Sequence, residues 1–159
     1  MKKFFSITLF AIALLSSSFI SPNNEELKWM DFNEGYELAK KKNKIMLVDV
    51  YTDWCGWCKV MDRETYAKPE VIKMINADFV AIKFNPEKKD VVYTFEGKQY
   101  TGDQLAGVIS NNQLTGYPTT IFMYPKGKKM NVVGGYQNEN NFKSLLTGIK
   151  SEFKTGVKK

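Results

Sequence analysis

The chain has 159 residues, a length that suits one domain with its own hydrophobic core and leaves little room for a second. Its 43% hydrophobic and 14% aromatic residues exclude an intrinsically disordered protein. The formal net charge is +6, but the lysines are scattered and no arginine-rich stripe or RNA-binding signature accompanies them. We therefore expect a solvated basic surface and no nucleic-acid partner.

Residues 1–18 have the pattern of a secretory signal peptide. A positively charged start precedes an apolar run over 4–15, and three small serines follow, as signal peptidase requires. We expect cleavage after Ser18, with Ser21 as the alternative, and no stable membrane insertion of the mature protein. The protein would then be exported, to the periplasm if the source is a Gram-negative bacterium. An uncleaved signal that anchors the protein in the membrane is the alternative.

The first part of the mature chain predicts a helix and a central strand. After a polar lead-in at 19–28, residues 29–32 suit a short edge strand or the start of a helix. Apolar side chains at helical spacing predict a helix over 33–42, which Asn43 would end. Residues 45–51 (IMLVDVY) form an apolar, β-branched run that is typical of a strand buried on both faces.

A helical pattern then continues as far as Ala67, and Pro69 breaks or restarts it. Residues 79–84 (FVAIKF) predict a second buried strand. Each of the two buried strands contains one charged side chain, Asp49 in the first and Lys83 in the second. A charge is costly inside a sheet unless it is paired, so these two residues are candidates for a role in the site.

Residues 86–115 are less regular. Alternating apolar residues before a Glu-Gly pair at 96–97 predict a small hairpin. Thr101 and Gln104 fit a capping box that would begin a short helix. Three apolar side chains of that helix are expected to face inward: Leu105, Val108 and Ile109.

Two strands and a helix complete the chain. The strands are predicted over 119–124 and 130–133, with a turn at 125–128 between them. The helix would begin near Asn138 and carry one apolar face. This order of elements predicts an α/β fold in which helices cover both faces of a central sheet.

The only two cysteines, Cys55 and Cys58, directly follow the first buried strand. A disulfide that closes so small a loop removes little entropy from the unfolded chain, which makes the pair a poor structural reinforcement. Zinc needs four ligands, and the chain has no histidine and no third cysteine. We therefore expect redox chemistry, with no metal and no bound cofactor, and keep an inert disulfide as the alternative.

Cysteines three residues apart on the first turn of a helix are close enough to form a disulfide. We expect Cys55 to face outward at the helix N-terminus, where the helix dipole and free N–H groups favour the thiolate and lower the pKa of the thiol. Cys55 would then attack a substrate disulfide. Cys58 would resolve the mixed disulfide that results.

The segment 48–59 (VDVYTDWCGWCK) resembles the active-site segment of the thioredoxin superfamily. Residues from Trp29 to about Asn85 resemble more closely the C-terminal domain of exported membrane thiol–disulfide interchange reductases. The resemblance implies a thioredoxin-like domain over 29–155, with a central mixed β-sheet flanked by helices on both faces. It covers two stretches well: 29–84 and 114–153. Residues 86–113 match less, which implies an inserted hairpin and helix before a cis-proline loop.

The resemblance also assigns a role to the two charged strand residues. Asp49 lies where thioredoxins keep a buried acid, and Lys83 where they keep its lysine partner. The acid would accept a proton when the thiol of Cys58 attacks. A purely structural ion pair between neighbouring strands is the alternative.

Two further segments carry over. Residues 116–119 (GYPT) resemble the loop whose cis proline packs against the active site, which implies that Pro118 is cis and that the backbone of Tyr117 pairs with substrate. A proline in a trans turn is the alternative. Where thioredoxins have Gly-Pro between the cysteines, this chain has Gly56 and Trp57, so the family's reduction potential does not carry over. Trp54 and Trp57 are expected to form an exposed apolar rim around the thiols that contacts partners, the alternative being simple packing. Gly56 is expected to lie with them at the substrate site.

The sequence thus predicts a thiol–disulfide oxidoreductase that acts on exported disulfide-containing or thiol proteins. A reductase outside the cytosol needs electrons from elsewhere, so we expect a membrane-bound thiol donor as a partner. An oxidase or isomerase with the same centre is one alternative. A non-catalytic binding module that uses 86–113 and the tryptophans to hold a partner is the other.

Overall fold

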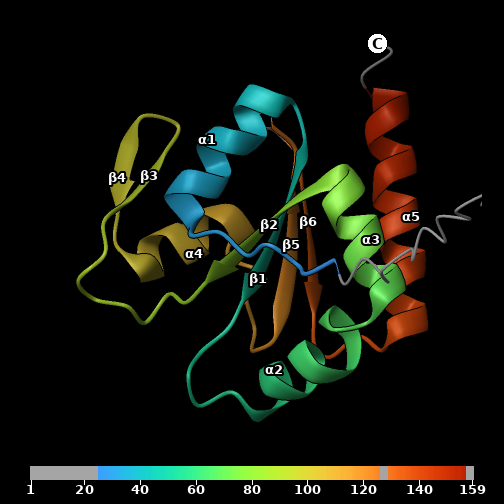
Figure 1. Ribbon diagram of the computed structural model, residues 1–159. Helices are drawn as coiled ribbons and strands as arrows, with labels where there is room; N and C mark the ends of the chain where they lie inside the picture. The colour runs from blue at the N-terminus through green and yellow to red at the C-terminus, as the bar shows by residue number, and fades with distance from the viewer. Residues whose placement is uncertain (1–24, 126–128, 157–159) are drawn as a thin grey trace, which may run out of the picture.

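The computed structural model describes residues 25–125 and 129–156, and a mixed four-stranded sheet lies at its centre (Figure 1). The strands run in the order β2-β1-β5-β6, in which β1 and β2 are parallel and the other neighbours antiparallel. Their bounds are β1 Ile45–Val50, β2 Phe79–Phe84, β5 Thr119–Met123 and β6 Met130–Gly134. The predicted sheet is confirmed. The signal-peptide and cleavage predictions, and residues 126–128 of the predicted turn, lie outside the described residues.

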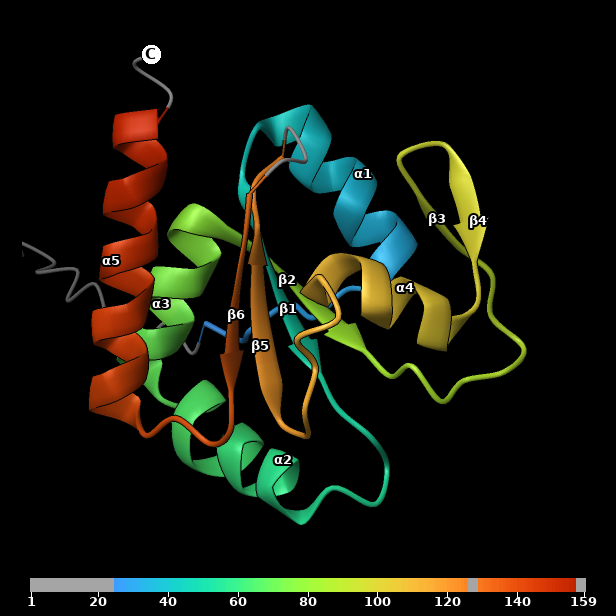
Figure 2. The same cartoon turned by 180° about the vertical axis from the view of Figure 1, so that it is seen from behind.

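Helices cover both faces of the sheet, as predicted (Figures 1 and 2). On one face lie α1 (Phe32–Lys42) and α4 (Gly102–Ser110), and on the other α2 (Gly56–Met61), α3 (Pro69–Asp78) and α5 (Glu139–Gly156). A separate hairpin of β3 (Tyr93–Phe95) and β4 (Lys98–Tyr100) contacts α1 and α4. Among the described residues, no helix has both the length and the apolar composition that crossing a membrane requires.

The central strand β1 is buried on both faces, and its side chains divide between two hydrophobic cores. Met46, Val48 and Val50 belong to the core under α1 and α4, whereas Ile45 and Leu47 belong to the core under α3 and α5. Successive strand residues point to opposite faces, and both faces of β1 are buried, so nearly every residue of this strand has to be apolar. The same alternation places Asp49 on the side of α3 and α5.

Local signals in the sequence set several element ends. Asn43 ends α1 in the left-handed conformation, with φ at 50°. Thr101 and Gln104 form both hydrogen bonds of the predicted capping box at the start of α4. In the segment 29–32, Met30 forms a β-bridge with Ile82 at the edge of β2, and α1 then begins at once. The segment 29–32 thus contains both an edge β-bridge and the start of a helix, the two structures between which its sequence left the choice open.

Two predictions about helices need correction. The helix predicted as far as Ala67 is α-helical only to Met61 and continues as one π-helical turn, η1 (Asp62–Tyr66). Val108 of α4, expected to face inward, is 37% exposed. The buried side chains of α4 are those of Leu105, Ala106, Ile109 and Ser110. Because each helical residue advances by about 100°, these four share one face of α4, and Val108 points away from it.

Candidate active site

The two cysteines form a disulfide where β1 leads into α2. Cys55 is the N-cap of α2, and its Sγ accepts a hydrogen bond from the backbone N–H of Cys58 at 3.1 Å. The two Cα atoms are 5.4 Å apart, within the usual range for a disulfide. The backbone N–H of Cys55 in turn donates to the carbonyl of Thr52, which fixes the turn after the strand. The predicted pairing on the first helical turn is confirmed.

Cys55 was expected to face outward, but in this oxidised state it is only 4% exposed. As an N-cap its side chain folds back over the first turn of α2, where the N–H of Cys58 binds the sulfur. Neither sulfur titrates while the disulfide is intact. The lowered pKa of Cys55 therefore stays a prediction about the reduced protein.

Below the disulfide, three polar side chains lie side by side on neighbouring strands. Asp49 of β1 is in register with Lys83 of β2 and with Thr120 of β5. The Nζ of Lys83 lies 2.6 Å from the Oδ2 of Asp49, so the resemblance paired the correct residues. Asp49 is 1% exposed, which makes this an ion pair inside the protein.

Burial and ion pairing act on these two groups in opposite directions. Burial raises the pKa of Asp49, and the charge of Lys83 offsets only part of that effect, so the net pKa lies above its ordinary value of 3.8. Burial by itself would lower the pKa of Lys83, but its interactions with Asp49 and Asp62 outweigh burial and raise the pKa. Lys83 therefore stays charged, and Asp49 holds a proton more readily than an exposed carboxyl does.

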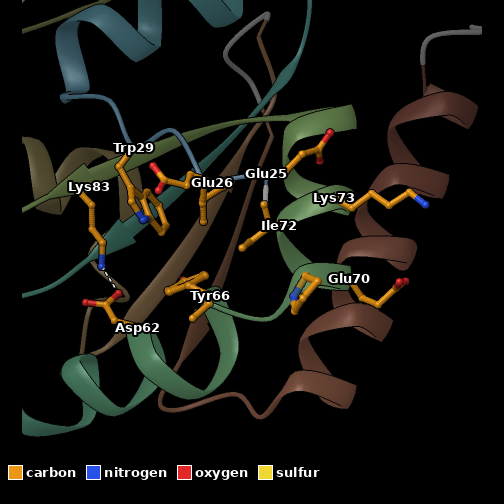
Figure 3. A pocket seen from close by; sticks show the side chains of 12 residues that line it. Glu25, Glu26, Trp29, Asp62, Tyr66, Glu70, Ile72, Lys73 and Lys83 are labelled. Carbon is orange, nitrogen blue, oxygen red and sulfur yellow. Dashed lines mark hydrogen bonds and ion pairs between the residues drawn. The ribbon is translucent and has the colours of Figure 1, made fainter. Parts of the chain in front are cut away.

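The structure adds Asp62, which the sequence had not singled out. Asp62 of η1 forms a second ion pair with Lys83 (Figure 3). The Nζ of Lys83 also lies over the ring of Trp29, with 4.7 Å between the nitrogen and the ring centre. One signal was present in the sequence: Asp62 follows Cys58 by four residues, a spacing that places both side chains on one face of a helix.

Tyr66 is the second site residue that sequence reasoning missed. Its hydroxyl donates to the Oδ1 of Asp49 at 3.4 Å and lies 3.3 Å from the Oγ1 of Thr120. Burial raises the pKa of Tyr66 well above its usual value, and the charge of Asp49 adds to this shift. Tyr66 thus stays neutral and donates a hydrogen bond to the buried carboxylate. No local pattern marks it, because its partners lie 17 and 54 residues away along the chain.

A cavity of about 680 Å³ opens beside these groups (Figure 3). Trp29, Asp62, Tyr66 and Lys83 line one part of it, and neither cysteine does. Charged side chains line much of the remainder: Glu25, Glu26, Glu70 and Lys73. The cavity therefore leads from solvent to Lys83 and Tyr66, the partners of Asp49. Within 25–125 and 129–156, no three His, Cys, Asp or Glu side chains are grouped so that they could hold a metal ion.

The two tryptophans of the motif are exposed, as expected, at 67% for Trp54 and 61% for Trp57. Each ring is held by another aromatic side chain. Trp54 meets the ring of Tyr117 edge to face at 5.7 Å, and Trp57 lies 5.5 Å from the ring of Tyr136. The Nε1 of Trp54 also donates to the carboxylate of Glu87 at 3.0 Å.

The loop before β5 has the predicted cis bond between Tyr117 and Pro118. Pro118 is buried, and its carbonyl accepts a hydrogen bond from the N–H of Gly135 at 2.7 Å. Gly56 borders open space, since a Cβ added there would meet no atom within 4 Å. The structure thus brings Trp54 and Tyr117 together beside the disulfide, and their contact with substrate stays a prediction.

Comparison with known proteins agrees with this geometry. A model of the Thioredox_DsbH family, described as a protein of unknown function, DUF255, matches residues 12–159. The human spermatogenesis-associated protein 20 is 32% identical over 128 residues, which are 76% of this chain and 15% of that protein. The thiol:disulfide interchange protein DsbD of Tatumella citrea is 25% identical over 118 residues, 73% of this chain and 18% of that protein. The chain thus spans less than a fifth of these two relatives.

A solved structure described as DsbH oxidoreductase has the same fold. It superimposes with a TM-score of 0.60 and covers 92% of this chain and 95% of its own, although only 16% of the residues are identical. This likeness confirms the thioredoxin fold. The Cys55–Cys58 disulfide stands in that fold at the spacing of a thiol–disulfide exchange centre.

Proposed function

We propose that this chain, which belongs to the Thioredox_DsbH family of the thioredoxin superfamily, is a thiol–disulfide oxidoreductase that reduces disulfides in exported polypeptides. The observation that carries the proposal is the Cys55–Cys58 disulfide, formed across the first turn of α2 at the end of the central strand. Two exposed tryptophans beside it, Trp54 and Trp57, offer apolar contact to a polypeptide.

The reduced protein begins the reaction with Cys55 as a thiolate. Its sulfur already accepts the N–H of Cys58 in the disulfide, and the same donor, with the positive end of α2, stabilises negative charge on that sulfur. The thiolate attacks one sulfur of the substrate disulfide. The substrate S–S bond breaks, a mixed disulfide with Cys55 forms, and the released substrate sulfur takes a proton from water.

Cys58 then completes the exchange. Its thiol loses a proton, its sulfur attacks the Sγ of Cys55, and the second substrate sulfur leaves and is protonated. The substrate gains two electrons and two protons, and the Cys55–Cys58 pair loses them. Asp49 is the proposed acceptor for the proton of Cys58, since burial raises its pKa and thereby makes it a better base than an exposed carboxylate.

The cycle needs a source of electrons, because each turnover leaves the centre oxidised. Outside the cytosol, we assign this role to a membrane-bound thiol protein. Its own two thiols would reduce the Cys55–Cys58 disulfide by the same kind of exchange. Export rests on the signal-peptide pattern at 1–18. Periplasmic location follows only if the source is a Gram-negative bacterium.

The test is the reduction of insulin by the mature chain in the presence of dithiothreitol. We expect clear acceleration over dithiothreitol alone and its loss in Cys55→Ser. Cys58→Ser is the matched control: reduced beforehand and mixed with insulin after dithiothreitol is removed, it should form the mixed disulfide once and hold it, which mass spectrometry detects. A chain that accelerates nothing, yet binds a partner equally well after both cysteine replacements, would instead be a binding module.

The direction of transfer is tested separately by equilibrating the Cys55–Cys58 couple with glutathione. For a reductase we expect a potential below about −230 mV, on the reducing side of the glutaredoxins. A reduction potential of about −120 mV is typical of strong oxidants and would make the protein an oxidase or isomerase.

A further inference from the structure

The exposed ring of Trp54 is held in one orientation before any substrate arrives. Its Nε1 donates to both oxygens of Glu87, at 3.2 and 3.0 Å, and its ring makes a T-shaped contact with the ring of Tyr117. An exposed tryptophan that is fixed in this way loses little side-chain entropy when a partner binds. It also directly precedes Cys55, the sulfur that meets the substrate first.

Acidic side chains gather around this tryptophan. The buried side chain of Asn85 donates from Nδ2 to the Oδ1 of Asp53 at 3.3 Å, and its Oδ1 accepts the backbone N–H of Glu87 at 2.9 Å. Asn85 thus fixes Asp53 and Glu87 on the same side of the site. A third carboxylate, Asp103, lies near Tyr117, whose pKa is raised by burial and then by the charges of Glu87 and Asp103.

Within the described part of the chain, these three carboxylates have no partner that neutralises them. Among the residues that the structure describes, no lysine or arginine forms an ion pair with Asp53, Glu87 or Asp103. Lys88 and Lys89 follow Glu87 along the chain, but neither pairs with it. The chain as a whole carries a formal net charge of +6, so this local group of carboxylates has the opposite sign to the net charge of the protein.

The opposite side of the disulfide differs. There Trp57 packs against Tyr136, whose hydroxyl donates to Glu64 at 3.4 Å. Glu64 is already paired with Arg63, the Nη2–Oε1 distance being 3.1 Å. Both sides offer an aromatic ring, but among the described residues the side of Trp54 combines its ring with carboxylates that form no ion pair, whereas Glu64 beside Trp57 and Tyr136 is paired.

Resting on the proposed function, we infer that the protein selects disulfides whose attacked cysteine has a lysine or arginine next to it. The cationic side chain would lie over the exposed ring of Trp54, with Glu87 and Asp53 within reach of its charge. Aromatic faces and carboxylates both attract cations, and each contact at a solvent-exposed site contributes modestly. Together they correspond to a preference of about fivefold to tenfold in rate.

The experiment uses three disulfide-containing peptides that differ only at the residue next to the cysteine: lysine, glutamine or glutamate. Each is reduced by the mature chain, and kcat/KM is divided by the rate constant for dithiothreitol with the same peptide. This division matters because a neighbouring cation lowers the pKa of the substrate thiol and speeds its reaction with any thiolate. We expect the normalised value to be about fivefold higher for lysine than for glutamine, and lowest for glutamate.

Variants show whether the preference comes from the proposed residues. Glu87→Gln combined with Asp53→Asn should bring the lysine and glutamine peptides to within about twofold of each other, since the attracting charges are gone. Glu34→Gln, which removes an exposed carboxylate on α1, should leave the preference unchanged. In the unaltered protein, the lysine preference should also shrink as salt is raised from 0.01 M to 0.5 M, because salt screens exposed charges. This salt series does not depend on how well any variant folds.

Two results would overturn the inference and leave the proposed function intact: equal normalised rates for the lysine and glutamate peptides, or a preference that survives both the double substitution and high salt. If no peptide is reduced faster by the protein than by Cys55→Ser, the proposed function itself fails, and the inference fails with it.

Discussion

Asp49 and Lys83 occupy the same register position on β1 and β2, near the end of β1 that leads to the disulfide. The Nζ of Lys83 lies 2.6 Å from the Oδ2 of Asp49, and the two form an ion pair. The pair is asymmetric: Asp49 is almost fully buried, whereas Lys83 reaches the cavity beside Trp29. A buried carboxylate with a solvent-connected partner can change its protonation state without unfolding the protein.

Replacing Asp49 by Asn should stabilise the oxidised protein at neutral pH. The pKa of Asp49 is raised in the folded state by burial, so its favourable contribution is complete only below the unfolded value near 3.8 and is lost as pH rises through the folded value. The variant lacks this loss, and Lys83 keeps its ion pair with Asp62, so we expect the variant to gain stability over the unaltered protein as pH rises from 3 to 7.5. Urea unfolding from pH 3 to pH 8 measures it. The gain should vanish near pH 3, and a gain independent of pH would contradict the assignment.

Replacing Asp62 by Asn should change the pH profile more than the stability. Its side chain is half exposed, so losing its ion pair with Lys83 should cost no more than about 1 kcal/mol. The charge of Asp62 is one of the groups that raise the pKa of Asp49, and without it that pKa should fall. The acid limb of kcat/KM for insulin reduction should therefore move to lower pH. An unchanged limb would show that Asp49 does not control this step.

Replacing Tyr66 by Phe should move the same limb in the opposite direction. The hydroxyl of Tyr66 donates to Asp49, and that hydrogen bond lowers the pKa of the carboxyl. Its loss should raise the pKa of Asp49 and cost about 1 to 2 kcal/mol of unfolding free energy. Tyr93→Phe is the matched control, since its hydroxyl donates to the carbonyl of Asn85 and, among the described residues, not to Asp49. Equal pH profiles for the two variants would rule out a role of Tyr66 in setting the acid.

Replacing Thr52 by Val should stabilise the oxidised protein. The Oγ1 of Thr52 is buried and has no hydrogen-bond partner among the described residues, so its desolvation is not compensated. Valine has nearly the same shape, and we expect a gain of about 0.5 to 1.5 kcal/mol in urea unfolding. Thr65→Val is the contrasting control. The hydroxyl of Thr65 donates to the carbonyl of Gln137 at 2.6 Å, so its removal should lower the free energy of unfolding. A loss of stability in Thr52→Val would reveal a partner for that hydroxyl.

Replacing Gly102 by Ala should destabilise the start of α4. A Cβ there would lie 2.1 Å from the carbonyl oxygen of Pro86, a backbone atom that cannot move without displacing Glu87. We expect a loss of about 1 to 3 kcal/mol, typical of overpacking. Gly148→Ala, in an exposed part of α5 with open space around it, should instead stabilise the protein by about 0.5 to 1 kcal/mol. Thermal unfolding of the two variants compares them, and a neutral Gly102→Ala would contradict the close approach.

The residues of the site divide by how they could be found. Cys55 and Cys58 were evident from spacing alone, because two thiols on one helical turn are neighbours whatever surrounds them. Asp49 and Lys83 stood out as charges in strands that otherwise read as buried, and the resemblance to thioredoxins paired them correctly. Tyr66 could not be found in this way, since nothing in its local sequence separates it from an ordinary core tyrosine.

Local patterns also led to one wrong conclusion about Cys55. The cysteine at the helix N-terminus was expected to be open to solvent, but Cys55 is the N-cap of α2, and its side chain folds over the first turn and is buried. The acidic side of the site was missed for a related reason. Glu87 lies 33 residues from Trp54 and reaches it only because the loop after β2 passes beside the loop after β1.

Hydrophobic periodicity, caps and the Cys-x-x-Cys spacing were sufficient to predict the helices, the sheet and the reactive pair, since each depends on residues that are close along the chain. Tertiary packing decided how far Cys55 is exposed, which groups surround Asp49, and where Asp62, Tyr66 and Glu87 lie. Those properties depend on distances between strands and loops, and only the folded chain sets such distances.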